Sequence, residues 1–79
     1  KKSRGARLVS LADKVHNARA ILHDHKLVGN RVWARFKGKK SGTLWYYRRL
    51  TEEFKGRTPR PLWEMLNDAV TELETRAGT

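Results

Sequence analysis

Residues 8–22 read Leu8-Val9-Ser10-Leu11-Ala12-Asp13-Lys14-Val15-His16-Asn17-Ala18-Arg19-Ala20-Ile21-Leu22, and the rest of the chain is organised around them. They lie within the longest run of the chain without glycine or proline. Apolar side chains recur here at alternating spacings of three and four, namely at Leu8, Leu11, Val15, Ala18 and Leu22. Because successive residues of an α-helix turn by about 100°, this spacing puts them on one face. The sequence therefore predicts an amphipathic helix from about Ala6 to Lys26.

A short polar row lies opposite that apolar face. It consists of Asp13, Asn17, Ala20 and Asp24. A helix face that simply meets solvent is mostly charged, whereas apolar Val9 and Ile21 flank this row. We therefore expect both sides of the helix to be buried and the polar row to line a site.

The residues around Asp13 also resemble a known motif. Residues 11–19 read Leu-Ala-Asp-Lys-Val-His-Asn-Ala-Arg. This is similar to the segment of HD-domain metal-dependent phosphohydrolases in which Leu-Ala-Asp-Lys is followed, after two residues, by Asn. It resembles in particular the hydrolase domain of RelA/SpoT-type alarmone enzymes. Residues 33–36 and 44–48 continue the resemblance, because they are similar to the C-terminal part of small stand-alone HD proteins.

The resemblance spans nearly the whole chain but only the last part of the family's domain. The family's earlier signature, a His followed by a His-Asp pair, is missing, since the chain begins seven residues before Leu8. The resemblance thus implies that residues 1–79 are one unit, the C-terminal fragment of an HD phosphohydrolase with a partial HD-domain helical fold. Residues 1–28 would form the metal-ligand helix and residues 30–79 a C-terminal helical subdomain.

By the same resemblance, Asp13 matches the last Asp of the family's metal-binding set, which holds manganese or a similar divalent ion. A carboxylate with imidazoles suits such a metal, and a metal-activated water would attack the phosphoester. Asn17 matches a residue that helps to hold the nucleotide, and Lys14 and Arg19 match charged positions that can meet phosphate. The residues alone allow a surface Asp, a structural amide and ordinary ion pairs at these positions. No catalytic residue is expected in this segment alone, and the metal is not expected to bind tightly to it.

The tripeptide His23-Asp24-His25 contains a literal His-Asp pair, but it follows the Asp13 motif instead of preceding it. Two residues apart on a helix, His23 and His25 diverge by about 160°. We interpret them as a surface cluster at the helix end, where imidazolium suits the helix dipole.

The remaining chain predicts three more helices, so the expected fold is all-α with about four helices. They run from about Asn30 to Phe36, Leu44 to Lys55 and Pro61 to Arg76. Gly29 is expected to close the first helix, Asn30 and Thr43 to cap the next two, and Pro61 to begin the last. Residues 37–42 hold three lysines and two glycines and predict a flexible connector, with a phosphate-embracing loop as the alternative.

The aromatic residues of the second half interleave with arginines. The two sets are Trp33, Phe36, Trp45, Tyr46 and Tyr47, and Arg31, Arg35, Arg48 and Arg49. Helical spacing favours core packing, with a stripe of Leu44, Tyr47, Leu50 and Phe54 facing one of Leu62, Leu66, Ala69 and Leu73. The alternative is a small basic helical module that binds nucleic acid without catalysis.

Composition limits the remaining possibilities. The chain has 79 residues, no cysteine and a net charge of +10, so it forms one domain without disulfides or a thiolate zinc site. Residues 1–60 carry 17 of the 18 Lys and Arg and only four of the eight acids. Such a basic body attracts nucleotides, phosphorylated substrates or nucleic acid, although charge also serves solubility. No run approaches the length of a membrane span, so we expect a cytoplasmic protein without a membrane partner. Besides its substrate and the rest of the HD domain, self-association is a further expectation.

Overall fold

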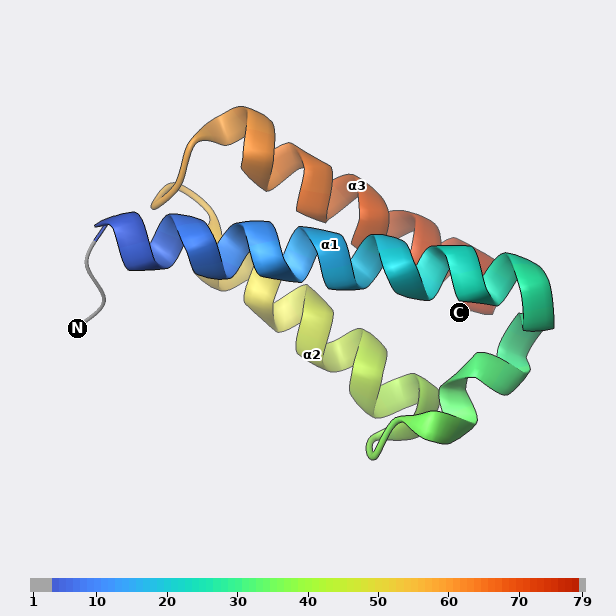
Figure 1. The fold of residues 1–79 in the computed structure, drawn as a ribbon. Helices are drawn as coiled ribbons and strands as arrows, with labels where there is room; N and C mark the ends of the chain where they lie inside the picture. Colours follow the sequence, from blue (N-terminus) through green and yellow to red (C-terminus); the bar gives the residue numbers. More distant parts are fainter. Residues whose placement is uncertain (1–3, 79) are drawn as a thin grey trace.

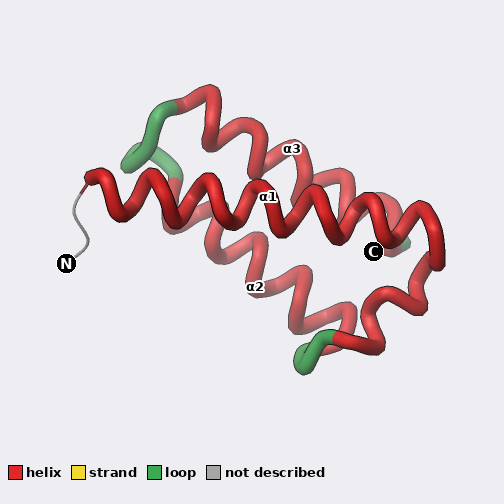
Figure 2. Tube along the Cα trace, viewed as in Figure 1, coloured by secondary structure: helices red, strands yellow, loops and turns green. Residues whose placement is uncertain are grey.

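The computed structural model describes residues 4–78 and consists of helices joined by short connections (Figure 1). The elements are α1 (Arg4–Val28), the 3-10 helix η1 (Gly29–Arg35), α2 (Lys39–Phe54) and α3 (Arg60–Ala77). No strand occurs in residues 4–78 (Figure 2), which confirms the all-α class. The prediction of about four helices is wrong for residues 4–78, because they hold three α-helices and the second predicted helix is a short 3-10 helix.

The seven residues of η1 form a long run for a 3-10 helix, and its end is closed by a 3-10-type hydrogen bond. The N-cap position of η1 is Val28, which makes no side-chain capping hydrogen bond. Asn30 lies inside η1, so the prediction that Asn30 caps this helix is wrong. The Asn30 side chain instead accepts a hydrogen bond from Trp33 Nε1 at 3.0 Å. At the other end, the Phe36 N–H donates to the Trp33 carbonyl at 3.1 Å, an i→i+3 bond typical of a tight turn.

The α2 helix begins at Lys39, five residues before the predicted start, so much of the predicted connector over 37–42 is helical. The Gly42 N–H donates to the Gly38 carbonyl at 2.9 Å, which continues the helical pattern through the glycines. Thr43 is therefore a buried residue inside the helix and not its cap. A glycine inside a helix costs about 1 kcal/mol of stability relative to alanine. The burial of Thr43 and Leu44 contributes more stability than this cost.

Gly29 and Pro61 lie at helix ends as predicted, and Gly78, which was not predicted, closes α3. Gly29 has φ +65 directly after α1, and Gly78 has φ +81 directly after α3, so both adopt the left-handed conformation that closes helices. Pro61 lies in the first turn of α3, where a missing N–H costs no hydrogen bond.

The core forms where α3 packs against both α1 and α2. Most residues of the predicted stripes supply it, together with Val70: Leu11, Val15, Ala18 and Leu22 from α1, Leu44, Tyr47 and Phe54 from α2, and Leu66, Ala69, Val70 and Leu73 from α3. Leu8, which was predicted to belong to the α1 stripe, is exposed instead. Leu50 and Leu62 pack against this core while partly exposed. In Figure 1, the α2 ribbon is near α1 at its C-terminal end and diverges from α1 toward its start. None of the helices within residues 4–78 is long and apolar enough to cross a membrane.

Candidate functional site

Three of the four predicted site residues lie together on the surface of α1. The Asn17 Nδ2 donates to Asp13 Oδ2 at 3.4 Å, and the Lys14 Nζ lies 3.7 Å from the same oxygen. Asp13 and Asn17 meet because residues four apart lie on the same side of a helix. Arg19 is exposed, and no hydrogen bond or ion pair joins it to the other three side chains. The structure therefore brings together Asp13, Lys14 and Asn17 but not Arg19.

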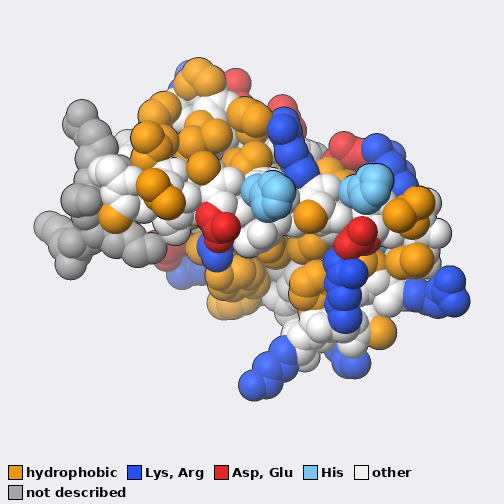
Figure 3. All heavy atoms as spheres, in the orientation of Figure 1, with side chains coloured by type: hydrophobic (Ala, Val, Ile, Leu, Met, Phe, Trp, Pro, Cys, Tyr) orange, Lys and Arg blue, Asp and Glu red, His pale blue; other side chains and the backbone are white. Residues whose placement is uncertain are grey.

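The polar row of α1 lies at the surface of this chain, contrary to the prediction that both of its sides are buried. The Asp13 side chain is 59% exposed. Ile21 on one flank is buried, whereas Val9 on the other is 70% exposed. Figure 3 shows acidic and histidine side chains along α1 on an uncovered face. The buried residues Leu11, Val15, Ala18 and Leu22 lie on the opposite side of α1 from Asp13, and α1 packs against α3 and η1.

The donor atoms in this segment do not fit a complete metal site. No three His, Cys, Asp or Glu side chains within the described residues gather around a common point. Asp13 has only an amide and an ammonium group beside it, and an ammonium is not a metal ligand. These residues would contribute at most one carboxylate, and one carboxylate does not hold a divalent ion tightly by itself.

The residues of the His23-Asp24-His25 cluster serve the packing of η1 on α1. Asp24 forms an ion pair with Arg35 of η1. His25 Nε2 lies 3.0 Å from Asn30 Oδ1, and its ring lies 6.0 Å from the Trp33 ring. His23 is exposed. Asp24 and His25 therefore join α1 to the segment that follows it.

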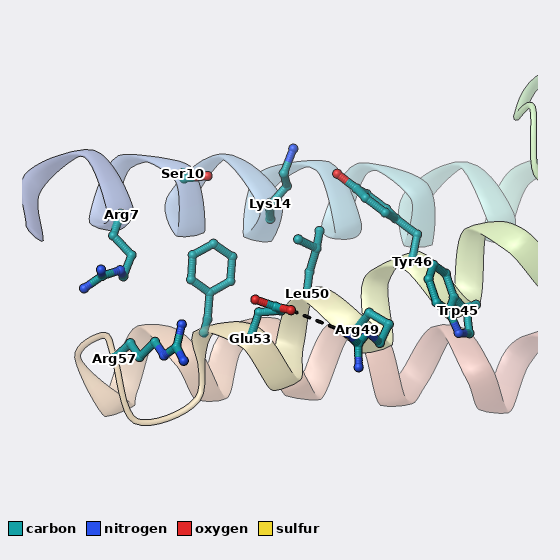
Figure 4. Close-up of a pocket in the computed structure, with 10 residues that line it drawn as sticks. Arg7, Ser10, Lys14, Trp45, Tyr46, Arg49, Leu50, Glu53 and Arg57 are labelled. Carbon is teal, nitrogen blue, oxygen red and sulfur yellow. Dashed lines mark ion pairs between the residues drawn. The ribbon is translucent and has the colours of Figure 1, made fainter. Parts of the chain in front are cut away.

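A cleft of about 630 Å³ separates the diverging faces of α1 and α2. Figure 4 shows its residues from both sides. They are Arg7, Ser10 and Lys14 of α1, Trp45, Tyr46, Arg49, Leu50, Glu53 and Phe54 of α2, and Arg57 of the following turn. Such a volume is typical of a ligand site.

The cleft is basic. Four of its side chains are cationic, and Glu53 is its single carboxylate. Arg49 Nη2 lies 3.7 Å from Glu53 Oε2, so this pair is loose. Arg57 forms no ion pair with any side chain that the structure describes. Arg7 and Arg57 extend into one end of the cleft and Trp45 and Tyr46 lie at the other (Figure 4). The arrangement attracts an anion between its walls.

The aromatic residues divide into a buried and an exposed group, so the prediction that all five of them pack in the core is wrong in part. Trp33 and Tyr47 are buried and Phe36 packs against the core. Trp45 is 66% exposed and Tyr46 is 44% exposed. Both line the cleft between α1 and α2 (Figure 4). Trp45 and Tyr46 therefore form an exposed aromatic surface, as the alternative prediction of a nucleic-acid-binding module requires.

The electrostatic field of Asp13 extends to α2. The pKa of the Tyr47 phenol is raised above its ordinary 10.0, first by burial, then by Tyr46 and then by the negative charge of Asp13. Lys14, which contacts Asp13, also lines the cleft. The Asp13 cluster therefore borders the basic cleft.

Sequence reasoning missed the cleft and its residues Arg7, Ser10 and Arg57. Part of the signal is present, because Arg7, Ser10 and Lys14 are spaced by three and four and share a face of α1. Trp45, Arg49 and Glu53 are likewise four apart on α2. Their meeting across a cleft depends on how α1 and α2 are oriented.

Comparison of the chain with protein-family models, with curated proteins and with solved structures gave no match.

Proposed function

We propose that this chain is the C-terminal part of an HD-type metal-dependent phosphohydrolase that acts on a nucleotide or related phosphoester. The observation that carries the proposal is the exposed Asp13 carboxylate on an uncovered face of α1, which accepts a hydrogen bond from Asn17 and lies 3.7 Å from the Lys14 ammonium. A carboxylate oriented by neighbours and open to approach is suited to complete a metal site whose other ligands come from elsewhere.

The bordering cleft supports the same function. A phosphoester carries negative charge, and the cleft beside Asp13 has three more cationic than anionic side chains. Lys14 takes part in both, since it touches Asp13 and lines the cleft. In the intact enzyme a divalent ion such as manganese would supply the activated water. The role of this chain is to orient the Asp13 carboxylate through Asn17 and to attract the phosphate through Lys14.

The test uses this chain and a longer protein that includes the residues encoded upstream of it. With manganese and a phosphodiester or guanosine tetraphosphate, the 79-residue chain should show no turnover, because it supplies at most Asp13. The longer protein should be active, and Asp13→Ala should abolish its activity without lowering the melting temperature of the metal-free form. Asp68→Ala, which removes an exposed carboxylate from α3, is the matched control and should leave activity intact.

Two results contradict the proposal. The first is full activity of the Asp13→Ala longer protein at saturating manganese, which removes the metal role of Asp13. The second is Asp13-dependent turnover by the 79-residue chain, which shows that no upstream ligands are needed.

A further inference from the structure

We propose that the side of α2 facing the cleft binds a single strand of nucleic acid, with the bases on Trp45 and Tyr46 and the phosphates on Arg7, Arg49 and Arg57. This binding site goes beyond the proposed function, since it requires neither a metal nor hydrolysis.

The first argument is that the cleft continues past Tyr46. A second hollow of about 220 Å³ lies toward the start of α2, lined by Phe36, Lys37, Gly38, Gly42, Thr43, Tyr46 and Tyr47. Tyr46 lines both hollows, so they lie next to each other along α2, and we call the two together the track. Lys37 adds a cation at the far end, which places positive charge on both sides of the exposed rings.

The second argument is the length of this track. It runs beside α2, whose 16 residues span about 24 Å at 1.5 Å per residue. Neighbouring nucleotides of one stacked strand are about 3.4 Å apart along the axis. The track is therefore long enough for several nucleotides, and a mononucleotide would leave one end of it empty.

The third argument is the kind of side chains that the track exposes. Trp45 is 66% and Tyr46 44% exposed, although large aromatic side chains usually gain stability from burial. Exposed rings between cations are the combination by which proteins hold single strands, because each base has a stacking face and each linkage a phosphate. The rings of Tyr46 and Tyr47 meet edge to face at 5.4 Å, so the buried Tyr47 supports Tyr46.

Glu53 provides a test of where the phosphates lie. Its carboxylate is on the cleft wall, 3.7 Å from Arg49, and would repel a phosphate bound there. If a strand occupies the cleft, removing this charge should strengthen binding and free Arg49 for the phosphate. By contrast, substitutions that remove a cation or an aromatic ring from the cleft should weaken binding of the strand.

The experiment measures the fluorescence anisotropy of labelled decauridylate (rU10) with the 79-residue chain at about 50 and 200 mM salt. The intact chain should bind and weaken as salt rises. Trp45→Ala should weaken binding about 5- to 150-fold, the equivalent of one lost stack. Arg57→Ala should weaken it and reduce the salt slope by about one. Glu53→Gln should tighten it.

Arg31→Ala is the matched control, since Arg31 is exposed on η1 and lines neither hollow. It removes the same charge and should change binding less than Arg57→Ala does. Circular dichroism should show that all variants keep their helix content, because each altered side chain is exposed. A second measurement with labelled decathymidylate distinguishes RNA from DNA. The same affinity for both strands indicates that the site accepts either nucleic acid, and weaker binding of decathymidylate indicates a preference for RNA.

Three results overturn the proposal. If Arg57→Ala and Arg31→Ala lose the same affinity for rU10, only the overall charge of the chain attracts the strand. Unchanged binding in Trp45→Ala and Tyr46→Ala excludes stacking on α2. Competition by ATP at the same concentration as rU10 means that the cleft takes a mononucleotide and not a strand. None of these results depends on whether the longer protein hydrolyses a phosphoester, so the two proposals fail separately.

Discussion

Tyr47 and Trp45 are two residues apart on α2 but have opposite surroundings, since Tyr47 is buried in the core and Trp45 is largely exposed. Tyr47→Ala leaves a cavity and should cost about 3–5 kcal/mol, as large aromatic truncations do. That is most of the stability of a domain this small, so the variant should be largely unfolded. Trp45→Ala should change the free energy of unfolding by about 0.5 kcal/mol or less. Urea denaturation followed by circular dichroism measures both, and equal losses would contradict the assigned burial.

The Tyr47 phenol also predicts a pH dependence. Its pKa in the folded chain is raised above 10.0, mainly by burial, so the fold favours the neutral phenol. The stability that this provides is fully present below the unfolded pKa of about 10 and is lost as the pH rises through the folded pKa. Tyr47→Phe cannot ionise, so its melting temperature should fall less than that of the intact chain between about pH 9 and 11. Tyr46→Phe is the comparison: it removes only the second cause of the raised Tyr47 pKa and keeps the buried phenol, so its melting temperature should fall more over this range than that of Tyr47→Phe.

Between elements, the Arg48 side chain makes a charged link from α2 to α3, in addition to the hydrogen bonds that Lys40 donates to the Ala77 carbonyl and Trp63 donates to the Thr51 carbonyl. The Arg48 guanidinium donates to Glu74 Oε1 at 2.8 Å, to Glu74 Oε2 at 3.1 Å and to Asn67 Oδ1 at 2.9 Å. The hydrogen bond to Glu74 is the largest cause of the raised pKa of Arg48, whose charge is therefore retained. Because the pair is partly exposed, Arg48→Ala should cost only about 1–2 kcal/mol.

Arg60 provides the comparison, since Arg60 Nε lies 2.9 Å from Glu64 Oε2 within the same exposed turn of α3. Arg60→Ala should therefore cost about 0.5 kcal/mol or less. Thermal or urea unfolding of both variants checks the difference. A loss in Arg48→Ala no larger than that in Arg60→Ala would mean that the link across the two helices adds nothing.

The start of α2 contains two glycines that differ in the space around them. A Cβ on Gly38 would lie 2.9 Å from the Gly42 Cα, and this backbone contact cannot be relieved by a side-chain rotation. A Cβ on Gly42 would meet nothing within 4 Å. Gly38→Ala should thus destabilise by about 1–3 kcal/mol through overpacking. Gly42→Ala should stabilise by about 0.5–1 kcal/mol through its better helix propensity. Chemical denaturation distinguishes them, and a stabilising Gly38→Ala would show that α2 begins differently.

Across the complete fold, the charge of +10 on 79 residues opposes compaction. Added salt screens this repulsion, so the melting temperature should rise between about 10 and 200 mM sodium chloride. Single-strand binding should fall over the same range, because counterion release then contributes less. A variant with Arg31→Gln and Lys37→Gln, both exposed, should gain less stability from salt than the intact chain does. A melting temperature independent of salt would show that the charge does not limit the fold.

Much of the helical organisation could be predicted from the sequence, because helices depend on local periodicity. The stripe from Leu11 to Leu22 and the stripe of α3 are both in the core. The start of α2 was missed because Gly38 and Gly42 look like a loop, whereas burial of Thr43 and Leu44 outweighs their poor propensity. The contact between Asp13 and Asn17 could be anticipated, since it depends only on the spacing of four within one helix.

Local patterns in the residues thus account for the all-α class, the membership of the apolar stripes and the Asp13–Asn17 side of α1. The packing of the helices, in contrast, leaves this side open and places Arg7 and Arg57 in one cleft with exposed Trp45. The physical reason is that α3 packs against both other helices and thereby sets their relative orientation. That orientation depends on how side chains from three distant segments interlock, and no local pattern in the sequence encodes it.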